Sequence, residues 1–156
     1  MKYVSTLIAV TDMEQSKTFY QEVLSLEVVA DFGANVTLTG GVALQTLETW
    51  KTFIHRDERQ ISLENGAGEL YFEEKDMDAF LNKLHTMERL RYVHPPLEHR
   101  WGQRVVRFYD PDGHIIEVGE PIKAVVRRFI QSGLSIEETA VRMDVPADYI
   151  KSCLTE

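Results

Sequence analysis

The amino-acid sequence predicts an α+β fold built from two copies of a β-α-β-β-β module, followed by helices at the carboxy terminus. The first observation is that the order of strand, capped helix and three strands occurs twice. The second is a matched spacing, since Ser5 stands seven residues before the helix-capping Asp12, and Glu69 stands seven before the helix-capping Asp76. The third is that the strand pattern stops before the carboxy terminus. These observations indicate a duplicated domain with a helical extension.

The first module is expected over about residues 1–47. A β-type run at 3–10 leads to a helix that Asp12 opens, with Gln15 three residues later as in a capping box. Glycines then separate three short β-type runs, which predict strands at 27–32, 35–39 and 41–47. Residues 48–68 mix aromatic and charged side chains, and we interpret them as a partly ordered crossover to the second module.

The second module is expected over about residues 69–121 and repeats this order. Its helix begins after Asp76 and has an apolar stripe at helical spacing. The predicted strands lie at 69–73, 91–94, 104–109 and 114–119. Together the two modules make up a domain of residues 1–121.

A tight hairpin near the end of the second module is the most informative local feature. The run Pro-Asp-Gly at 111–113 favours a turn between two β-rich flanks, because proline presets φ and glycine accepts a positive φ. Glu117 then lies in an apolar strand, where an unpaired carboxylate would be costly to bury, so a metal, an arginine or solvent in a cavity must compensate it. A glycine bulge in the turn would place Arg107 opposite Glu117, and this cross-strand pair could neutralise the carboxylate without a metal.

The helical extension is expected over residues 122–156. An apolar stripe ends at Gly133, Ser135 begins a further helix with a capping box, and Pro146 lies in the first turn of a last helix. The spacing of the apolar positions is typical of helix-turn-helix packing. Residues 123–156 hold five bases and five acids, so we regard DNA binding as the disfavoured alternative to packing on a cavity, a partner or the chain itself.

Composition restricts the class of protein. The net charge of −8 argues against generic binding to nucleic acid or anionic membranes. No apolar run is long enough to span a membrane, and the amino terminus does not have the pattern of a signal peptide. The single cysteine, Cys153, excludes an internal disulfide and suggests a reducing compartment. We therefore expect a cytoplasmic protein.

Four features together resemble the vicinal oxygen chelate superfamily, which contains glyoxalase I, extradiol dioxygenases, fosfomycin-resistance proteins and bleomycin-binding proteins. They are the paired modules, the Phe19-Tyr20 pair, the Trp101-Gly102 pair and the string DPDGHIIEV at 110–118. The resemblance covers residues 1–121. It implies a half-open barrel around a cavity, completed within one chain or across a homodimer.

The resemblance also implies where a divalent metal would be held. The corresponding positions are Ser5, Gln45, Glu69 and Glu117. Histidine is common in the family at the two first-strand positions, and its replacement by Ser5 and Glu69 argues against extradiol dioxygenase chemistry. The expected metal set is Gln45, Glu69 and Glu117, with Mg²⁺, Mn²⁺, Ni²⁺ or Zn²⁺ as candidate ions, and an oxygen-rich set favours Mg²⁺, Mn²⁺ or Ca²⁺ over Zn²⁺. Glu117 is the expected catalytic residue.

Small-molecule sites are usually cavities with aromatic walls and a few polar anchors. The residues expected to contact a ligand are Ser5, Leu7, Tyr71, Trp101, Arg107 and Phe108. Three functions stay open: a metal-assisted lyase or isomerase, a metal-free protein that sequesters a small molecule, and a regulatory or interaction protein that uses the helical tail.

Most of these residues also have a structural interpretation. Glu69 could be a solvated strand end, and Gln45 could be a buried amide bonded to backbone. The aromatic side chains could be ordinary core.

Overall fold

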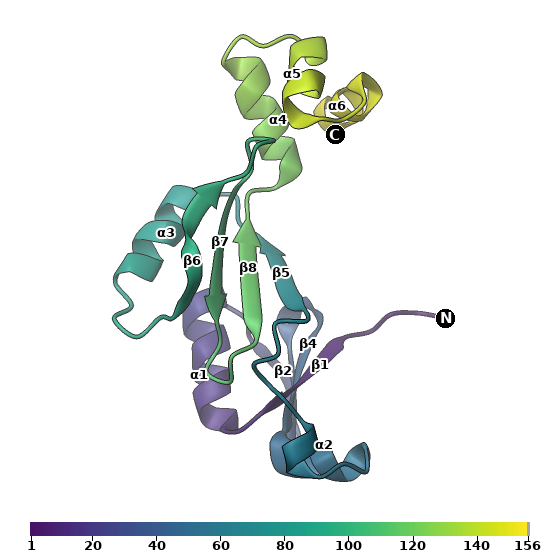
Figure 1. Ribbon diagram of the computed structural model, residues 1–156, viewed down its shortest axis with the longest axis vertical. Coiled ribbons are helices and arrows are strands. Elements are labelled where there is room, and N and C mark those ends of the chain that lie inside the picture. The colour runs from purple at the N-terminus through teal and green to yellow at the C-terminus, as the bar shows by residue number, and fades with distance from the viewer. Residues whose placement is uncertain (156) are drawn as a thin grey trace. The chain divides into compact units, whose positions relative to one another are not determined.

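The computed structural model describes residues 1–155 and confirms the α+β fold, with two four-stranded sheets that are not closed (Figure 1). The chain forms two compact units. The first comprises Met1–Gly68 and Tyr109–His114, and the second comprises Glu69–Phe108 and Ile115–Glu156. The turn of the predicted hairpin therefore belongs to the first unit, whereas the strands on either side of it belong mainly to the second.

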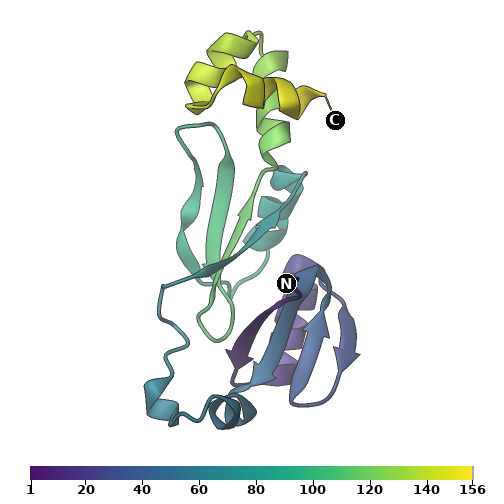
Figure 2. The same ribbon diagram turned by 90° about the vertical axis from the view of Figure 1, so that its right-hand side faces the viewer.

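The first unit contains the first module. Its sheet has the strand order β1-β4-β3-β2, with β1 parallel to β4, and α1 lies against one face (Figure 2). Asp12 caps α1 by accepting a hydrogen bond from the Gln15 amide at 2.9 Å. The elements are β1 (Thr6–Val10), α1 (Met13–Leu24), β2 (Val28–Asp31), β3 (Asn35–Leu38), η1 (Thr39–Gly41), β4 (Val42–Thr46), α2 (Leu47–Phe53) and η2 (Glu58–Gln60).

The main difference from prediction in this unit is the late start of β1. The sequence pattern begins at residue 3, but the strand begins at Thr6, which pairs with Val42, the first residue of β4. Residues before Thr6 have no β4 residue to pair with, because the Gly40-Gly41 turn precedes Val42. The crossover at 48–68 contains most of α2 and the short η2 helix.

The second unit repeats the same topology, which agrees with the predicted duplication. Its sheet has the order β5-β8-β7-β6, with β5 parallel to β8. The predicted strand at 91–94 is longer than expected, because it continues through Pro95 and Pro96. Prolines are tolerated there because β6 is an edge strand. The elements are β5 (Glu69–Glu73), α3 (Met77–His85), β6 (Tyr92–Glu98), β7 (Arg104–Tyr109) and β8 (Ile115–Gly119).

Helix α3 covers one face of this second sheet (Figure 1). Its buried residues are Met77, Phe80 and Leu84, and the Phe80 ring lies 6.5 Å from the Phe108 ring of β7. Side chains alternate between the faces of a strand, so Phe108 faces α3 and its neighbour Arg107 faces the other way. The sheet thus has one apolar face and one face that carries charged side chains.

Three helices follow β8 and gather in a bundle of their own (Figure 1). They are α4 (Ile122–Gln131), α5 (Ile136–Met143) and α6 (Ala147–Leu154). The predicted capping box of α5 is present, and Ala140 and Ile150 are buried in the bundle core as helix-turn-helix spacing requires. Asp144 occupies the left-handed position of the turn, at φ 60°. Pro146 precedes α6 as its cap instead of lying in its first turn.

A charged network joins this bundle to the second sheet. Glu120 is buried and accepts hydrogen bonds from the Arg104 amide at 3.0 Å and the Arg104 Nε at 2.9 Å. Arg128 of α4 donates to the same carboxylate at 2.9 Å and to the Gly102 carbonyl at 2.6 Å. The Phe129 ring fills the space beside Gly102, where a Cβ atom would come within 2.2 Å of it.

Within residues 1–155, no helix combines the length and the apolar character that a membrane span requires.

The turn at 109–114 is held by a buried carboxylate. Both Tyr20 Oη and His114 Nδ1 lie 2.8 Å from Asp110 Oδ2, and Asp110 Oδ1 accepts from the backbone amides of Asp112 and His114. Burial and the charge of Asp110 raise the pKa of Tyr20 well above its usual value, so its hydroxyl remains a donor at neutral pH.

We predict that Asp110→Ala lowers the free energy of unfolding by about 3 kcal/mol, because it leaves several buried donors unsatisfied. Urea unfolding measures this.

Tyr20→Phe is the matched comparison, because it removes one donor and leaves the turn intact. It should cost only about 1 kcal/mol. Equal losses in the two variants would contradict a central role for Asp110.

The Glu120 network predicts a pH dependence of stability. Burial opposes ionisation of Glu120, but hydrogen bonds from Arg104 and the charge of Arg128 outweigh it and lower its pKa below the usual value of 4.5. A lowered carboxylate pKa stabilises the fold above the unfolded pKa, and this contribution is lost as pH falls through the folded pKa. Denaturation between pH 6 and pH 3 should therefore show a shallower loss of stability for Glu120→Gln than for the unmodified chain. Parallel curves would contradict this assignment.

Candidate functional site

Arg107 is the centre of a charged cluster on the sheet face opposite α3. Its Nε donates to Glu69 Oε2 at 2.9 Å, its second terminal nitrogen forms an ion pair with Glu117 Oε2, and its first lies 3.5 Å from His94 Nε2. The Glu117 side chain is only 7% exposed, and that of Arg107 is 23% exposed. The predicted cross-strand pair between Arg107 and Glu117 is therefore confirmed.

The hairpin turn explains this pairing. The Asp110 amide donates to the His114 carbonyl at 3.0 Å, the Gly113 amide donates to the Asp110 carbonyl at 3.1 Å, and Gly113 has φ 88°. This is the expected turn with a glycine bulge. Three residues further from the turn on each strand, Arg107 lies opposite Glu117. The local turn chemistry thus sets the register of the cluster.

Strand β5 adds the third side of the cluster. Tyr71 pairs with Glu117 across the parallel β5–β8 ladder, so their side chains share a face, and Glu69 lies two residues before Tyr71 on the same face. We call the residues Glu69, Tyr71, His94, Arg107 and Glu117 the Arg107 face.

Aromatic and amide groups lie next to the Arg107 face. Tyr71 Oη accepts from Gln103 Nε2 at 3.1 Å, and the Gln103 amide oxygen accepts from the Trp101 indole at 3.1 Å. The Trp101 ring stacks on His99 at a centroid distance of 4.1 Å. Burial, together with the charge of Arg107, lowers the pKa of His99, which favours the neutral imidazole at pH 7.

The predicted ligand-contacting residues divide between several environments. Tyr71 is 46% exposed beside Glu117, whereas Phe108 is fully buried on the other face of the sheet, as ordinary core. Trp101 is partly buried and packs against the core of the helical bundle. Ser5 and Leu7 belong to the first unit, where Leu7 is 37% exposed. The second unit therefore brings together Tyr71, Arg107 and Glu117 from the predicted set.

Gln45 also belongs to the first unit, and its amide is already engaged. It is 2% exposed, accepts from Asn35 Nδ2 at 2.8 Å and donates to the Thr49 hydroxyl. The alternative of a buried, satisfied glutamine therefore describes it well, although its partners are side chains and not backbone.

These residues do not fit a divalent metal as they are arranged. The cation between Glu69 and Glu117 is the Arg107 guanidinium, which cannot lose its proton at physiological pH. Among residues 1–155, no group of three or more His, Cys, Asp or Glu side chains is positioned to hold a metal ion. The predicted alternative of a solvated Glu69 is also incomplete, since its carboxylate is paired with Arg107.

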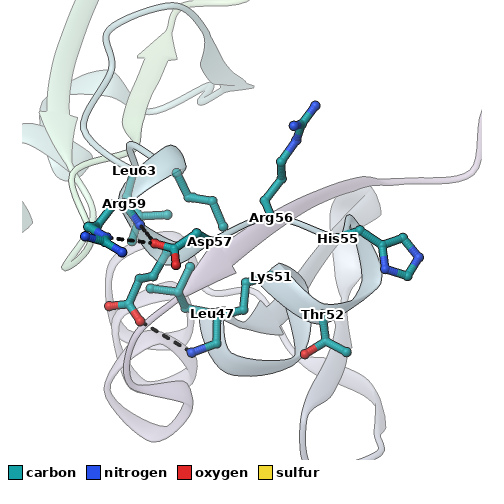
Figure 3. A pocket seen from close by; sticks show the side chains of 10 residues that line it. Leu47, Lys51, Thr52, His55, Arg56, Asp57, Arg59 and Leu63 are labelled. Atoms are coloured by element: carbon teal, nitrogen blue, oxygen red, sulfur yellow. Dashed lines mark hydrogen bonds and ion pairs between the residues drawn. The ribbon is translucent and has the colours of Figure 1, made fainter.

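A pocket in the crossover was not predicted as a site. It has a volume of about 870 Å³ and lies within the first unit (Figure 3). Several of its charged side chains pair with neighbours, such as Lys51 with Glu58 and Arg59 with Asp57. The mixture of aromatic and charged residues in the crossover was the available signal. The pocket is lined by Leu47, Lys51, Thr52, His55, Arg56, Asp57, Glu58, Arg59, Ile61 and Leu63.

Comparison with known families gives a match to the glyoxalase-like domain over residues 3–123. The chain belongs to this glyoxalase-like family. The match covers the duplicated domain and ends at the start of the helical extension.

Solved structures show the same fold. A protein of unknown function from Agrobacterium tumefaciens is 38% identical, with a TM-score of 0.70, over 78% of this chain and 94% of that one. A member of the glyoxalase/bleomycin resistance protein/dioxygenase superfamily from Sphaerobacter thermophilus is 27% identical, with a TM-score of 0.57, over 78% and 98%. Lactoylglutathione lyase from Agrobacterium tumefaciens is 23% identical, with a TM-score of 0.59, over 78% and 94%.

No curated protein gives a significant match. The family match and the structural neighbours confirm the predicted membership of the glyoxalase/bleomycin resistance/dioxygenase superfamily. These solved structures share their fold with the duplicated domain of this glyoxalase-like chain.

The Arg107–Glu117 pair predicts strong energetic coupling. Arg107→Met leaves the Glu117 carboxylate buried without a partner, so the free energy of unfolding should fall by about 3 kcal/mol. Adding Glu117→Gln should recover much of this loss, because no charge then remains unpaired. A double-mutant cycle in urea measures the coupling.

The exposed Lys151–Asp148 pair is the control, since its side chains are 54% and 92% exposed. Its coupling energy should stay below about 1 kcal/mol. Additive effects at Arg107 and Glu117 would show that the pair does not stabilise the fold.

Proposed function

We propose that this glyoxalase-like protein binds a small organic molecule on the Arg107 face, without a metal ion. The observation that carries the proposal is a largely buried ion pair, Arg107–Glu117, on a sheet face that also presents an exposed tyrosine. A few polar anchors among aromatic groups are the usual form of a small-molecule site.

The two carboxylates that hold Arg107 differ in their surroundings. Glu117 is buried, so its pair with Arg107 is protected from solvent, whereas the Glu69 side chain is 37% exposed. An exposed ion pair contributes at most about 1 kcal/mol, so an acidic oxygen of a ligand can replace Glu69 on the guanidinium Nε. Glu117 meanwhile keeps Arg107 in place. Arg107 is therefore the proposed anchor for a carboxylate or similar oxygen group.

Aromatic groups suit the remainder of such a ligand. Tyr71 lies beside Glu117 in the sheet register and presents part of its ring to solvent. A planar ring can pack against this phenol, since offset and edge-on aromatic contacts are favourable. We therefore propose a planar, aromatic acid as the class of ligand.

The arrangement gives less support to the other functions that the sequence left open. A metal-assisted lyase requires an ion where the Arg107 guanidinium now lies between Glu69 and Glu117. A DNA-binding tail requires a basic face, but on α6 Lys151 is paired with Asp148.

The homodimer and the cytoplasmic location stay predictions. Sedimentation equilibrium would check the homodimer.

The test is a titration of the ¹⁵N-labelled protein with a panel of benzoate derivatives, and with benzylamine derivatives as probes of opposite charge. Shifts at the Arg107 Nε–H and the Tyr71 amide are expected with the acids. Arg107→Met should weaken binding at least tenfold. Tyr71→Ala should weaken it several-fold, and because Tyr71 is 46% exposed this variant should keep the fold.

Arg56→Met is the matched control. Arg56 lines the crossover pocket and lies in another unit of the chain. Loss of binding in Arg56→Met, with unchanged binding in the Tyr71 and Arg107 variants, would place the ligand in the crossover pocket and overturn the proposal. Preference for the amines would overturn the proposed ligand class.

A further inference from the structure

We infer that Asn65 is a site of spontaneous deamidation, at which the backbone nitrogen of Gly66 displaces the side-chain amide of Asn65 as ammonia. The site lies in the crossover between the two modules and does not depend on the proposed function. Two features carry the inference, namely an asparagine followed by glycine and the surroundings in which the fold places this pair.

The sequence offers few places for this reaction. The chain has three asparagines, and the residues that follow them are Val36, Gly66 and Lys83. Glycine has no Cβ atom, so its backbone nitrogen is less hindered than that of a residue with a side chain. Asn65 is therefore the asparagine that its local sequence protects least.

The structure leaves the attacking nitrogen accessible. Asn65 and Gly66 are both exposed. Apart from the chain neighbours of Gly66, no described heavy atom lies within 4 Å of the position that a Cβ atom on it would occupy. Within residues 1–155, the Gly66 amide donates no hydrogen bond. The nitrogen can therefore approach the Asn65 side chain without first breaking an interaction.

The Asn65 side chain is polarised in the direction that the reaction needs. Its Oδ1 accepts a hydrogen bond from the Ala67 amide at 2.8 Å, and its Nδ2 donates to the Ser62 carbonyl at 3.0 Å. A donor on Oδ1 stabilises the negative charge that develops there during attack, as in an oxyanion hole. The two reacting groups are adjacent in one chain, so the reaction needs no bimolecular encounter.

The covalent steps balance without an oxidant or a reductant. The Gly66 nitrogen loses its proton to solvent base and forms a bond to Asn65 Cγ. The bond between Cγ and Nδ2 breaks, and Nδ2 takes up a proton and leaves as ammonia. The product is a succinimide ring. Water then opens the ring at either of its carbonyl carbons, which leaves an aspartate or an isoaspartate at position 65.

The hairpin turn provides a contrast. Asp112 is also followed by a glycine, and an aspartate can form the same ring. However, the Gly113 amide already donates to the Asp110 carbonyl at 3.1 Å, and the Asp112 carboxylate accepts from the Thr11 amide at 3.1 Å. Both reacting groups of this pair are therefore engaged, whereas the nitrogen that would attack Asn65 is not.

The experiment incubates the purified full chain at neutral and at mildly alkaline pH, and follows each asparagine by peptide mass spectrometry. Asn65 should convert at least about tenfold faster than Asn35, which precedes a β-branched residue, or Asn82, which precedes a helical amide. The conversion should be faster at alkaline pH, because the attacking nitrogen must lose its proton. The melting temperature should stay the same, since position 65 is exposed.

Two variants make the test specific. Gly66→Ala places a methyl group beside the attacking nitrogen and should slow the conversion of Asn65. Asn65→Gln would have to close a larger ring, so position 65 should stay unconverted. A methyltransferase specific for isoaspartate should therefore label the incubated unmodified chain much more strongly than incubated Asn65→Gln.

Either of two results would overturn the inference. One is equal conversion at the three asparagines of the unmodified chain, which is measured without any variant. The other is a conversion of Asn65 that Gly66→Ala does not slow. Both concern the covalent state of the crossover, so they leave the titration with benzoates as a separate test of the proposed function.

Discussion

The burial of Glu117 is the constraint on which the second unit depends. A carboxylate on an apolar strand is costly to bury without a counter-charge, and Arg107 supplies one directly. The turn at Gly113 makes this pairing a consequence of register, since a slip of one residue would send Arg107 to the other face of the sheet. The parallel pairing of β5 with β8 then brings Glu69 to the same guanidinium.

The same pair decides what chemistry the face can support. A metal ion and a guanidinium compete for the same carboxylates, and the guanidinium is covalently attached to β7, so it does not need to be captured from solution. Arginine also offers directional donors, which a metal ion does not. Under the proposed function, Arg107 is the anchor for planar oxygen groups and Glu117 is its buried support.

Two further buried carboxylates each connect neighbouring elements of the structure. Asp110 joins the hairpin turn to Tyr20 of α1, and Glu120 joins β7 to α4 through Arg104 and Arg128. Each is satisfied by several donors from different elements, which is how a buried charge stabilises an arrangement instead of disrupting it. The helical extension is therefore attached by a specific polar network and by Phe129 packing beside Gly102.

The sequence by itself determined the duplicated β-α-β-β-β order, the helix starts at Asp12, Asp76 and Ser135, and the hairpin turn. Capping, turn chemistry and apolar periodicity act over only a few residues, so they can be recognised along the chain. It also offered three ways to compensate Glu117, namely a metal, an arginine or solvent in a cavity, without choosing among them. Only the tertiary structure shows the pairing with Arg107, because that pairing depends on which side chains from neighbouring strands meet across the sheet. Those contacts join residues distant in sequence, where local patterns carry no information.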